Sequence, residues 1–400
     1  MRRLGFTATR FAVIGLAIAA TGYAGDGFAG ASTPACQPWN SQQPGPGTLV
    51  GVATLPNCEV WAVGGANNHT LAEHLFGQAW TQVPSPDPAG KGHNNNLAGV
   101  AATGSSNAWA VGNYSAGKTT RTLILRWDGA VWTQQASPNP GGPAHPAALT
   151  GVAASSASDA WAVGSYSNGK ARQTLILRRN AKAKSWSRVP SPSPGGAAHD
   201  SKLTSVAIVS ASDAWAAGYY QTARAFRQTL ILHWDGKSWT QVPTPNPGGP
   251  SHGNLLFGVT ATSARNAWAV GYDTTASGAT TLVLRWNGKS WARVPSPNRA
   301  TGAPPKIDQL QGVTALSATN AWAVGYYQLS GTGFYTLILH WDGTAWHWMR
   351  SPDPAVDNDF LVGVVATSAS SVWAVGGFNS GFGEGEQSLV LHWNGTAWQS

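Results

Sequence analysis

Four histidines recur at one position of a repeated pattern, and imidazole groups in such numbers are suited to metal binding or to ligand recognition. Each lies seven residues before an anchor valine that recurs along the chain. Gly-Gly-Pro precedes two of them, which favours a fixed turn over four loops folding inward to one ion. We therefore expect each histidine to bond within its own repeat, with no shared metal, while ligand binding by this column stays open. The four are His93, His145, His199 and His252.

Carboxylates form the second group of candidates, because a cluster could bind calcium and a pair could cleave a glycan. The chain has only 17 Asp and Glu residues, and most of them lie in expected turns. Solvated loop charges explain the remainder more simply. No nucleophile elbow, phosphate loop or zinc motif is present, so no cofactor is predicted. The exceptions gather around the last repeat: Asp353, Asp357, Asp359, Glu384 and Glu386.

A long internal repeat positions these residues. Its pattern is L-x-G-V-A-A-T-S-A-S-[DN]-A-W-A-V-G, a variable stretch, and T-L-I-L-[RH]-W-[DN]-G-x-x-W-T-Q-V-P-S-P-N-P. Seven copies at intervals of 48 to 54 residues cover most of the chain, and periods of this size are typical of propellers and related arrays. The anchor valines are Val52, Val100, Val152, Val206, Val259, Val313 and Val364.

Each copy reads as four short strands. The runs of Leu, Ile, Val and Trp lack strict alternation, which indicates strands buried on both faces. Such a unit needs a like neighbour on each side, and a closed ring supplies one for every copy. The sequence therefore predicts an all-β fold, a seven-bladed β-propeller of four-stranded antiparallel blades, over residues 47–400.

The ends of the pattern bear on export and ring closure. Basic residues, a short apolar run and Ala29-Gly30-Ala31 are typical of a signal peptide, predicted over residues 1–31. Residues 32–46 echo the end of a repeat and are predicted to close the ring against the last copy, which stops early. In an exported chain, the two cysteines, Cys36 and Cys58, are expected to form one disulfide.

The period, the strand order and the tryptophan that opens the fourth strand resemble kelch-type propellers, the galactose-oxidase-like group. The kelch glycine doublet occurs only at Gly64-Gly65 and Gly376-Gly377. The Trp-Asp pairs, such as Trp127-Asp128, resemble WD40 repeats, and the order of elements is similar to that of tectonin-type propellers. These resemblances imply a propeller fold and do not select a function.

Two further columns recur. We expect the basic column to pair with acceptors at the start of the neighbouring strand, Glu59, Asn107, Asp159, Asp213, Asn266, Asn320 and Ser371. We expect the aromatic column to pack between blades rather than to stack on sugars. The basic column is His74, Arg126, Arg178, His233, Arg285, His340 and His392, and the aromatic column is Tyr114, Tyr166, Tyr220, Tyr327 and Phe378.

Loop variation indicates where a partner binds. The second-to-third-strand loops and the connections between repeats vary and share one face, here called the variable face, whereas the other turns are nearly uniform. A formal charge of +8, spread along the chain, favours neither nucleic acid nor membrane insertion. We expect a secreted monomer that binds a glycan, a cell-wall polymer or a protein. The alternative is a secreted glycan-acting hydrolase or oxidase, and the absence of a catalytic motif favours binding.

Overall fold

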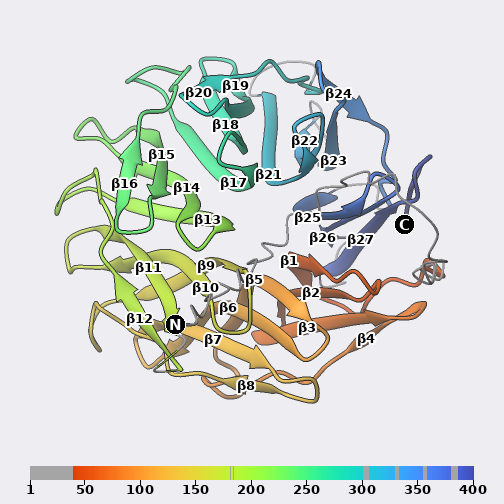
Figure 1. Ribbon diagram of the computed structural model, residues 1–400, viewed down its shortest axis with the longest axis horizontal. Coiled ribbons are helices and arrows are strands. Elements are labelled where there is room, and N and C mark those ends of the chain that lie inside the picture. Colours follow the sequence, from red (N-terminus) through yellow and green to blue (C-terminus); the bar gives the residue numbers. More distant parts are fainter. Residues whose placement is uncertain are drawn as a thin grey trace, which may run out of the picture.

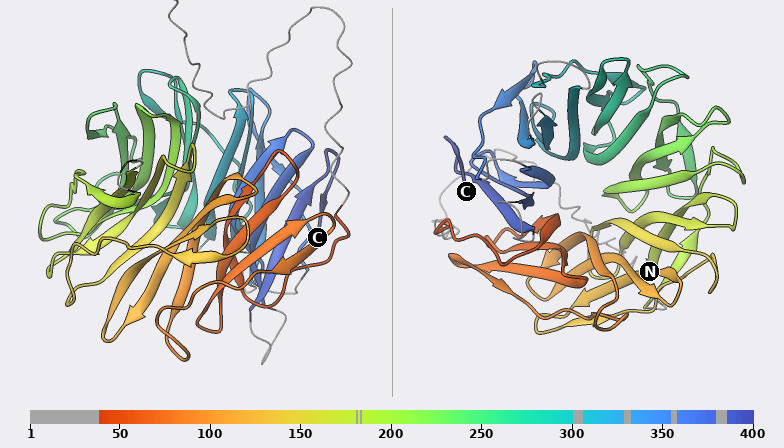
Figure 2. Two further views of the ribbon diagram at one scale, coloured as in Figure 1. Left: turned by 60° about the horizontal axis from the view of Figure 1, so that its bottom comes forward. Right: turned by 180° about the vertical axis from the view of Figure 1, so that it is seen from behind.

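The structure, a computed structural model, describes residues 39–180, 182, 184–300, 306–328, 333–354, 358–379 and 386–400. Four-stranded sheets stand side by side around a central axis, with the first strand of each repeat innermost and the fourth outermost (Figure 1). We call the four strands of one repeat a unit and number the units from the N-terminus. Units 1 and 7 lie next to each other, so the ring is closed (Figure 2). Among the described residues, no helix is long and apolar enough to cross a bilayer.

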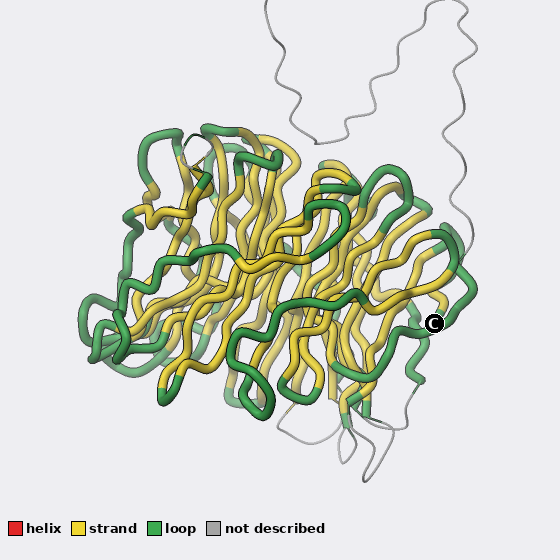
Figure 3. The backbone as a smooth tube through the Cα atoms, turned by 90° about the horizontal axis from the view of Figure 1, so that it is seen from below, coloured by secondary structure: helices red, strands yellow, loops and turns green. Residues whose placement is uncertain are grey.

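The strands alternate with short turns (Figure 3). Units 1 to 4 contain β1 (Thr48–Thr54), β2 (Val60–Ala66), β3 (His69–Phe76), β4 (Ala79–Gln82), β5 (Asn95–Gly104), β6 (Asn107–Ala116), β7 (Thr119–Trp127), β8 (Trp132–Gln134), β9 (Ala147–Ala154), β10 (Ala160–Ser167), β11 (Arg172–Asn180), β12 (Ser185–Val189), β13 (Ser201–Ser210), β14 (Asp213–Gln221), β15 (Arg227–Trp234) and β16 (Trp239–Val242). Units 5 to 7 contain β17 (Asn254–Ser263), β18 (Asn266–Thr275), β19 (Gly278–Trp286), β20 (Trp291–Arg293), β21 (Lys306–Ser317), β22 (Asn320–Gln328), β23 (Phe334–Trp341), β24 (Trp346–Met349), β25 (Phe360–Ser368), β26 (Ser371–Phe378), β27 (Gln387–Trp393) and β28 (Trp398–Gln399).

The predicted seven separate blades need correction, because the structure has five. Units 1, 2, 3, 4 and 7 are separate four-stranded blades, whereas the strands of units 5 and 6 join in one eight-stranded sheet. The joint is a short parallel pairing of Gly278 and Ala279 with Lys306 and Ile307. At this interface β20 covers only the last three residues of β19, and the 12-residue β21 reaches the uncovered edge. The repeat pattern contains no signal for this pairing.

A bulge in the innermost strand explains one glycine of each repeat. In unit 4 the pairing of β13 with β14 skips Thr204, and Gly218 lies opposite this bulge. A Cβ on Gly218 would lie 2.0 Å from the carbonyl oxygen of Lys202, closer than atoms can pack. The same bulge and the same glycine recur in every unit, so this position excludes side chains for a steric reason. The glycines are Gly64, Gly112, Gly164, Gly218, Gly271, Gly325 and Gly376.

We expect Gly218→Ala to destabilise the protein by about 3 kcal/mol, because the strands must separate to admit the methyl group. Gly104→Ala is the matched control, since a Cβ there meets nothing within 4 Å. Urea unfolding monitored by tryptophan fluorescence measures both. Equal midpoints for the two variants would show that the close approach at Gly218 is absent in solution.

Tryptophans fill the interfaces between units. Trp161 on β10 is fully buried, and its ring centroid lies 5.0 Å from that of Trp234 and 5.2 Å from that of Trp239, both in the next unit. Aromatic rings at these separations add edge-to-face attraction to a large burial of apolar surface. The clusters therefore hold neighbouring units together. Equivalent clusters are Trp61–Trp127–Trp132, Trp215–Trp286–Trp291, Trp268–Trp341–Trp346 and Trp322–Trp393–Trp398.

Two interfaces depart from this arrangement. In unit 3 Arg179 replaces the tryptophan that ends the third strand in other units. Its buried guanidinium lies 5.3 Å from the ring centroid of Trp109. In unit 1 Leu75 replaces the same third-strand tryptophan. Trp39 from the N-terminal segment supplies a ring instead, and its centroid lies 5.5 Å from that of Trp373. The interface between units 7 and 1 thus obtains one ring of its aromatic cluster from outside the repeats, whereas Trp80, 6.0 Å from Trp373, belongs to the repeat.

Residues 39–47, here called the strap, run along β27 of the last unit. Gly47 N donates to Glu386 O at 2.9 Å. The Gln43 amide accepts from Val390 N at 2.8 Å and donates to Val390 O at 3.0 Å. The strap therefore occupies the part of the β27 edge that the two-residue β28 leaves uncovered, and it joins the last unit to the first. The predicted boundaries at residues 31 and 46 stay predictions, as does the signal peptide, which lies outside the described residues.

The Ser-Pro-Asn segment of each repeat clamps the third strand. In unit 2 the N–H of Thr122 donates to Asn139 Oδ1 at 3.0 Å, and its hydroxyl lies 2.6 Å from Ser137 Oγ. Units 1 and 3 to 6 repeat this arrangement. In unit 7 Ser388 Oγ donates instead to Gly47 O of the strap. The segment is a structural clamp, and Asp353 belongs to it.

Cys58 lies in the turn between β1 and β2, where its N–H donates to Leu55 O at 3.0 Å. Cys36 lies outside the described residues. The Cys36–Cys58 disulfide therefore stays a prediction.

Candidate functional site

The basic column has a structural role. In unit 4, His233 Nε2 lies 2.9 Å from Asp213 Oδ1, and the His233 ring centroid lies 4.2 Å from that of Trp215. The pairing with the predicted acceptor is confirmed in six units, and all seven basic groups also lie against the tryptophan of the second strand. Burial lowers the pKa of His392 to about 4, which keeps this imidazole neutral near pH 7. The column does not form a ring of free cations.

The four candidate histidines lie in separate loops between units. His252 Nδ1 lies 3.0 Å from Gly248 O of the same loop. The carbonyl of His93 accepts a hydrogen bond from Asn95 Nδ2 at 2.8 Å. Within the described residues no three His, Cys, Asp or Glu side chains gather as metal ligands would. None of the four lines the pocket described below, although His93 directly precedes one of its lining residues, Asn94.

The acidic candidates do not form one described cluster. Asp359 is fully buried immediately before β25, five residues before its anchor valine. Asn95, Ser201, Asn254 and Asp308 occupy the same column and accept backbone N–H groups of the preceding loop. Asp359 lies in this same column. Asp357 and Glu384 lie outside the described residues, whereas Glu386 is exposed beside a pocket.

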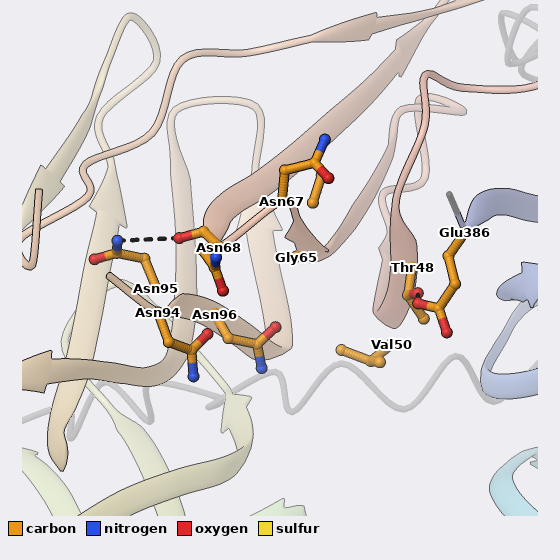
Figure 4. Close-up of a pocket in the computed structure, with 10 residues that line it drawn as sticks. Thr48, Val50, Gly65, Asn67, Asn68, Asn94, Asn95, Asn96 and Glu386 are labelled. Atoms are coloured by element: carbon orange, nitrogen blue, oxygen red, sulfur yellow. Dashed lines mark hydrogen bonds between the residues drawn. The ribbon is translucent and has the colours of Figure 1, made fainter. Parts of the chain in front are cut away.

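This pocket, here called the amide pocket, lies at unit 1 on the variable face and is lined on one side by unit 2 and on the other by unit 7 (Figure 4). Its volume is about 290 Å³, at the small end of the range for small-molecule sites. Asn95 donates to Asn68 O at 3.1 Å, which fixes the loop between β2 and β3 against the start of β5. The hydroxyl of Thr48 bonds the carboxylate of Glu386 across the junction. The lining residues are Thr48, Val50, Gly65, Ala66, Asn67, Asn68, Asn94, Asn95, Asn96 and Glu386.

The pocket offers amide groups in unusual density. Each asparagine side chain presents two N–H donors and a carbonyl acceptor, so a few of them can match hydroxyl groups that both donate and accept. Asn67, Asn68 and Asn94 are exposed, and Asn96 is half-buried. This pocket was not predicted from the sequence, although the run Asn94–Asn96 breaks the repeat pattern and is a signal for it.

The predicted aromatic column packs between units, as expected. Tyr114, Tyr166, Tyr220 and Tyr327 join the apolar clusters there, and Phe378 does so in unit 7. The residue before each of these lies on the opposite face of the strand, since successive side chains alternate. This neighbouring column, which we call the rim, varies around the ring: Gly65, Asn113, Ser165, Tyr219, Tyr272, Tyr326 and Gly377.

The rim position holds glycine or a small polar residue in units 1 to 3 and tyrosine in units 4 to 6. Tyr219, Tyr272 and Tyr326 are each half-buried, so part of every ring faces solvent. Tyr326 donates its hydroxyl to Gln309 at 2.8 Å, and the ring of Phe257 stacks 5.7 Å from that of Tyr272. The rim begins beside the amide pocket at Gly65 and continues to the tyrosines. Tyrosines recur less regularly in the rim than in the neighbouring aromatic column, so the repeat pattern did not single out the rim.

The ring of sheets and its variable rim define the protein as a β-propeller. No family model matches the chain, and no curated protein sequence is similar to it. Solved structures share the fold at low identity. YCF48 bound to a D1 peptide is 13% identical over 89% of this chain and 95% of that one, with a TM-score of 0.52. The kelch-type resemblance is not confirmed by any of these comparisons.

Two further similar structures have names that describe enzymes acting on polysaccharides. The GH74 xyloglucanase from Xanthomonas campestris is 13% identical over 89% of this chain and 53% of that chain, with a TM-score of 0.57. A PL25 ulvan lyase is 9% identical over 90% of this chain and 97% of that one, with a TM-score of 0.53. At these identities the likeness shows the propeller fold alone.

Proposed function

We propose that this protein is an exported β-propeller that binds a polysaccharide, such as a cell-wall polymer, through the rim and the amide pocket of its variable face. The observation that carries the proposal is the convergence of Asn67, Asn68, Asn94 and Asn96 with the Thr48–Glu386 pair around one pocket. Sugars present many hydroxyl groups, and a site built to bond them rejects ligands that lack them, because its polar groups would then stay unpaired.

The arrangement supports binding more than catalysis. Cleavage by two carboxylates requires a pair about 5–10 Å apart. Among the described lining residues of the amide pocket, Glu386 is the single carboxylate, and it bonds Thr48. The xyloglucanase and the ulvan lyase show that a propeller can carry polysaccharide chemistry, and YCF48 shows that one can bind a peptide.

A glycan array followed by calorimetry tests the proposal. We expect the mature chain to bind a polysaccharide and Asn96→Ala to weaken that binding about tenfold, because one or two hydrogen bonds of about 1 kcal/mol each are lost. Asn287→Ala, in a uniform turn of the opposite face, is the control. Release of reducing ends that disappears in Glu386→Gln would favour an enzyme, and an array with no bound glycan would overturn the proposal.

A further inference from the structure

Cationic groups without carboxylate partners lie beside the tyrosines of the rim. Lys202 on β13 pairs in register with Tyr219 on β14. The guanidinium of Arg227, at the start of β15, lies 5.2 Å from the centroid of the Tyr219 ring. Among the described residues neither Lys202 nor Arg227 forms an ion pair, whereas nearby Arg172 bonds Asp200 at 3.3 Å. Two positive charges therefore lie beside the rim at unit 4 without a carboxylate partner among the described residues.

The electrostatics of these groups show that they are close enough to act together. Burial, followed by the charges of Arg172 and Arg227, lowers the pKa of Lys202. Burial raises the pKa of Tyr272, while Arg227 acts on it in the opposite direction. Arg227 thus influences the amine of unit 4 and the phenol of unit 5. A half-buried ammonium group next to other cations is costly unless an anion accompanies it.

We propose that Lys202, Tyr219, Arg227 and Tyr272, here called the cationic rim, bind the anionic groups of an acidic polysaccharide. This inference rests on the proposed function and adds the class of ligand, a sugar polymer that carries carboxylate or sulfate groups. Arg227 provides a planar fork of donors that matches either anion, and Lys202 provides a point charge. The tyrosine rings present apolar faces for the C–H groups of a sugar and hydroxyls at their edges.

The remainder of the rim is consistent with a polymer rather than a small anion. Between the cationic rim and the amide pocket the rim column holds the buried Ser165 and the half-buried Asn113, and the uncharged amides of the pocket suit hydroxyl groups. The cationic rim and the amide pocket thus differ in chemistry, the first selecting charge and the second hydroxyl pattern. A chain with acidic groups at intervals satisfies both.

The test compares soluble acidic polymers (alginate, polygalacturonate, chondroitin sulfate, dextran sulfate) with neutral ones (galactomannan, xyloglucan, dextran) on the full mature chain. We expect binding to acidic polymers only, weaker at higher salt, and at least tenfold weaker in Arg227→Gln and in Lys202→Gln. Arg265→Gln, which removes a charge from the uniform turn between β17 and β18, is the control and should bind as the wild type does. Thermal melting confirms that the variants are folded.

The outcomes separate this inference from the proposed function. Binding confined to neutral polymers and weakened by Asn96→Ala would overturn the acidic ligand and leave polysaccharide binding intact. Acidic binding reduced equally in Arg227→Gln and Arg265→Gln would show general charge attraction and would also overturn the inference. Binding of none of the polymers, or of a peptide instead, would overturn both.

Discussion

Replacing Trp161 with alanine is expected to lower the free energy of unfolding by about 3–5 kcal/mol, because a fully buried indole between two units is lost. The substitution also removes the ring on which the Arg178 guanidinium lies, 4.7 Å from the centroid. Adjacent units are joined there by Trp234 and Trp239, whose rings would border a cavity. Trp161→Phe should fall between the wild type and the alanine variant.

Urea unfolding followed by circular dichroism measures this loss, since the midpoint and the slope together give the free energy. Phe76→Ala is the control, because Phe76 is 70% exposed and its removal should change stability by less than about 0.5 kcal/mol. A Trp161→Ala variant as stable as Phe76→Ala would show that the tryptophan clusters do not hold the units together.

The second large effect concerns a carboxylate at the junction of units 7 and 1. Glu73 occupies the column that Leu125, Leu177 and the other repeats fill with leucine, and it is 1% exposed. Burial raises the pKa of Glu73 to about 7, although the N–H of Gly45 in the strap opposes this shift. Between pH 4.5 and 7 the folded carboxyl retains a proton that the unfolded chain releases. Wild-type stability therefore falls as the pH rises through this window.

Glu73→Leu should remove this dependence. We expect its stability advantage over the wild type to be about 3 kcal/mol larger at pH 8 than at pH 4.5, because each pKa unit corresponds to about 1.4 kcal/mol. Thermal melting at the two pH values measures the difference, and Glu73→Gln controls for charge with nearly unchanged shape. A wild type and a Glu73→Leu variant with parallel pH profiles would contradict burial of this carboxylate.

Much of the fold could be predicted from the sequence because the repeat is strict. The glycine and tryptophan columns have one steric or packing role in every unit, so each copy reinforces the assignment. Pairing between units escaped prediction, since the contact of Gly278 with Lys306 depends on how far two strands extend and leaves no residue pattern. For the same reason the seven predicted blades became five blades and one larger sheet.

The candidate site was harder to predict, because function lies where the repeat breaks. His252 is a chemical side chain that the pattern singled out, yet its imidazole bonds Gly248 O of its own loop, and Asn254, in the column of Asp359, holds the same loop. Glu73, Leu75 and Arg179 each differ from the residue that the other repeats place at the same position, and each lies at an interface that departs from the others. Asn94–Asn96 and the change from Ser165 to Tyr219 break the pattern at the rim. Comparing each copy with its neighbours is thus more informative than searching for catalytic motifs.

Hydrogen exchange with and without a bound polysaccharide tests the central claim most directly, because it locates the ligand on the whole chain. The polymer identified on the array is added in excess, and backbone exchange is compared by mass spectrometry. We predict slower exchange at residues 65–68, 94–97 and 219–227, which carry the amide pocket and the rim, and unchanged exchange at the uniform turns 155–159 and 235–238. Protection confined to those uniform turns would place the ligand on the opposite face and contradict the account.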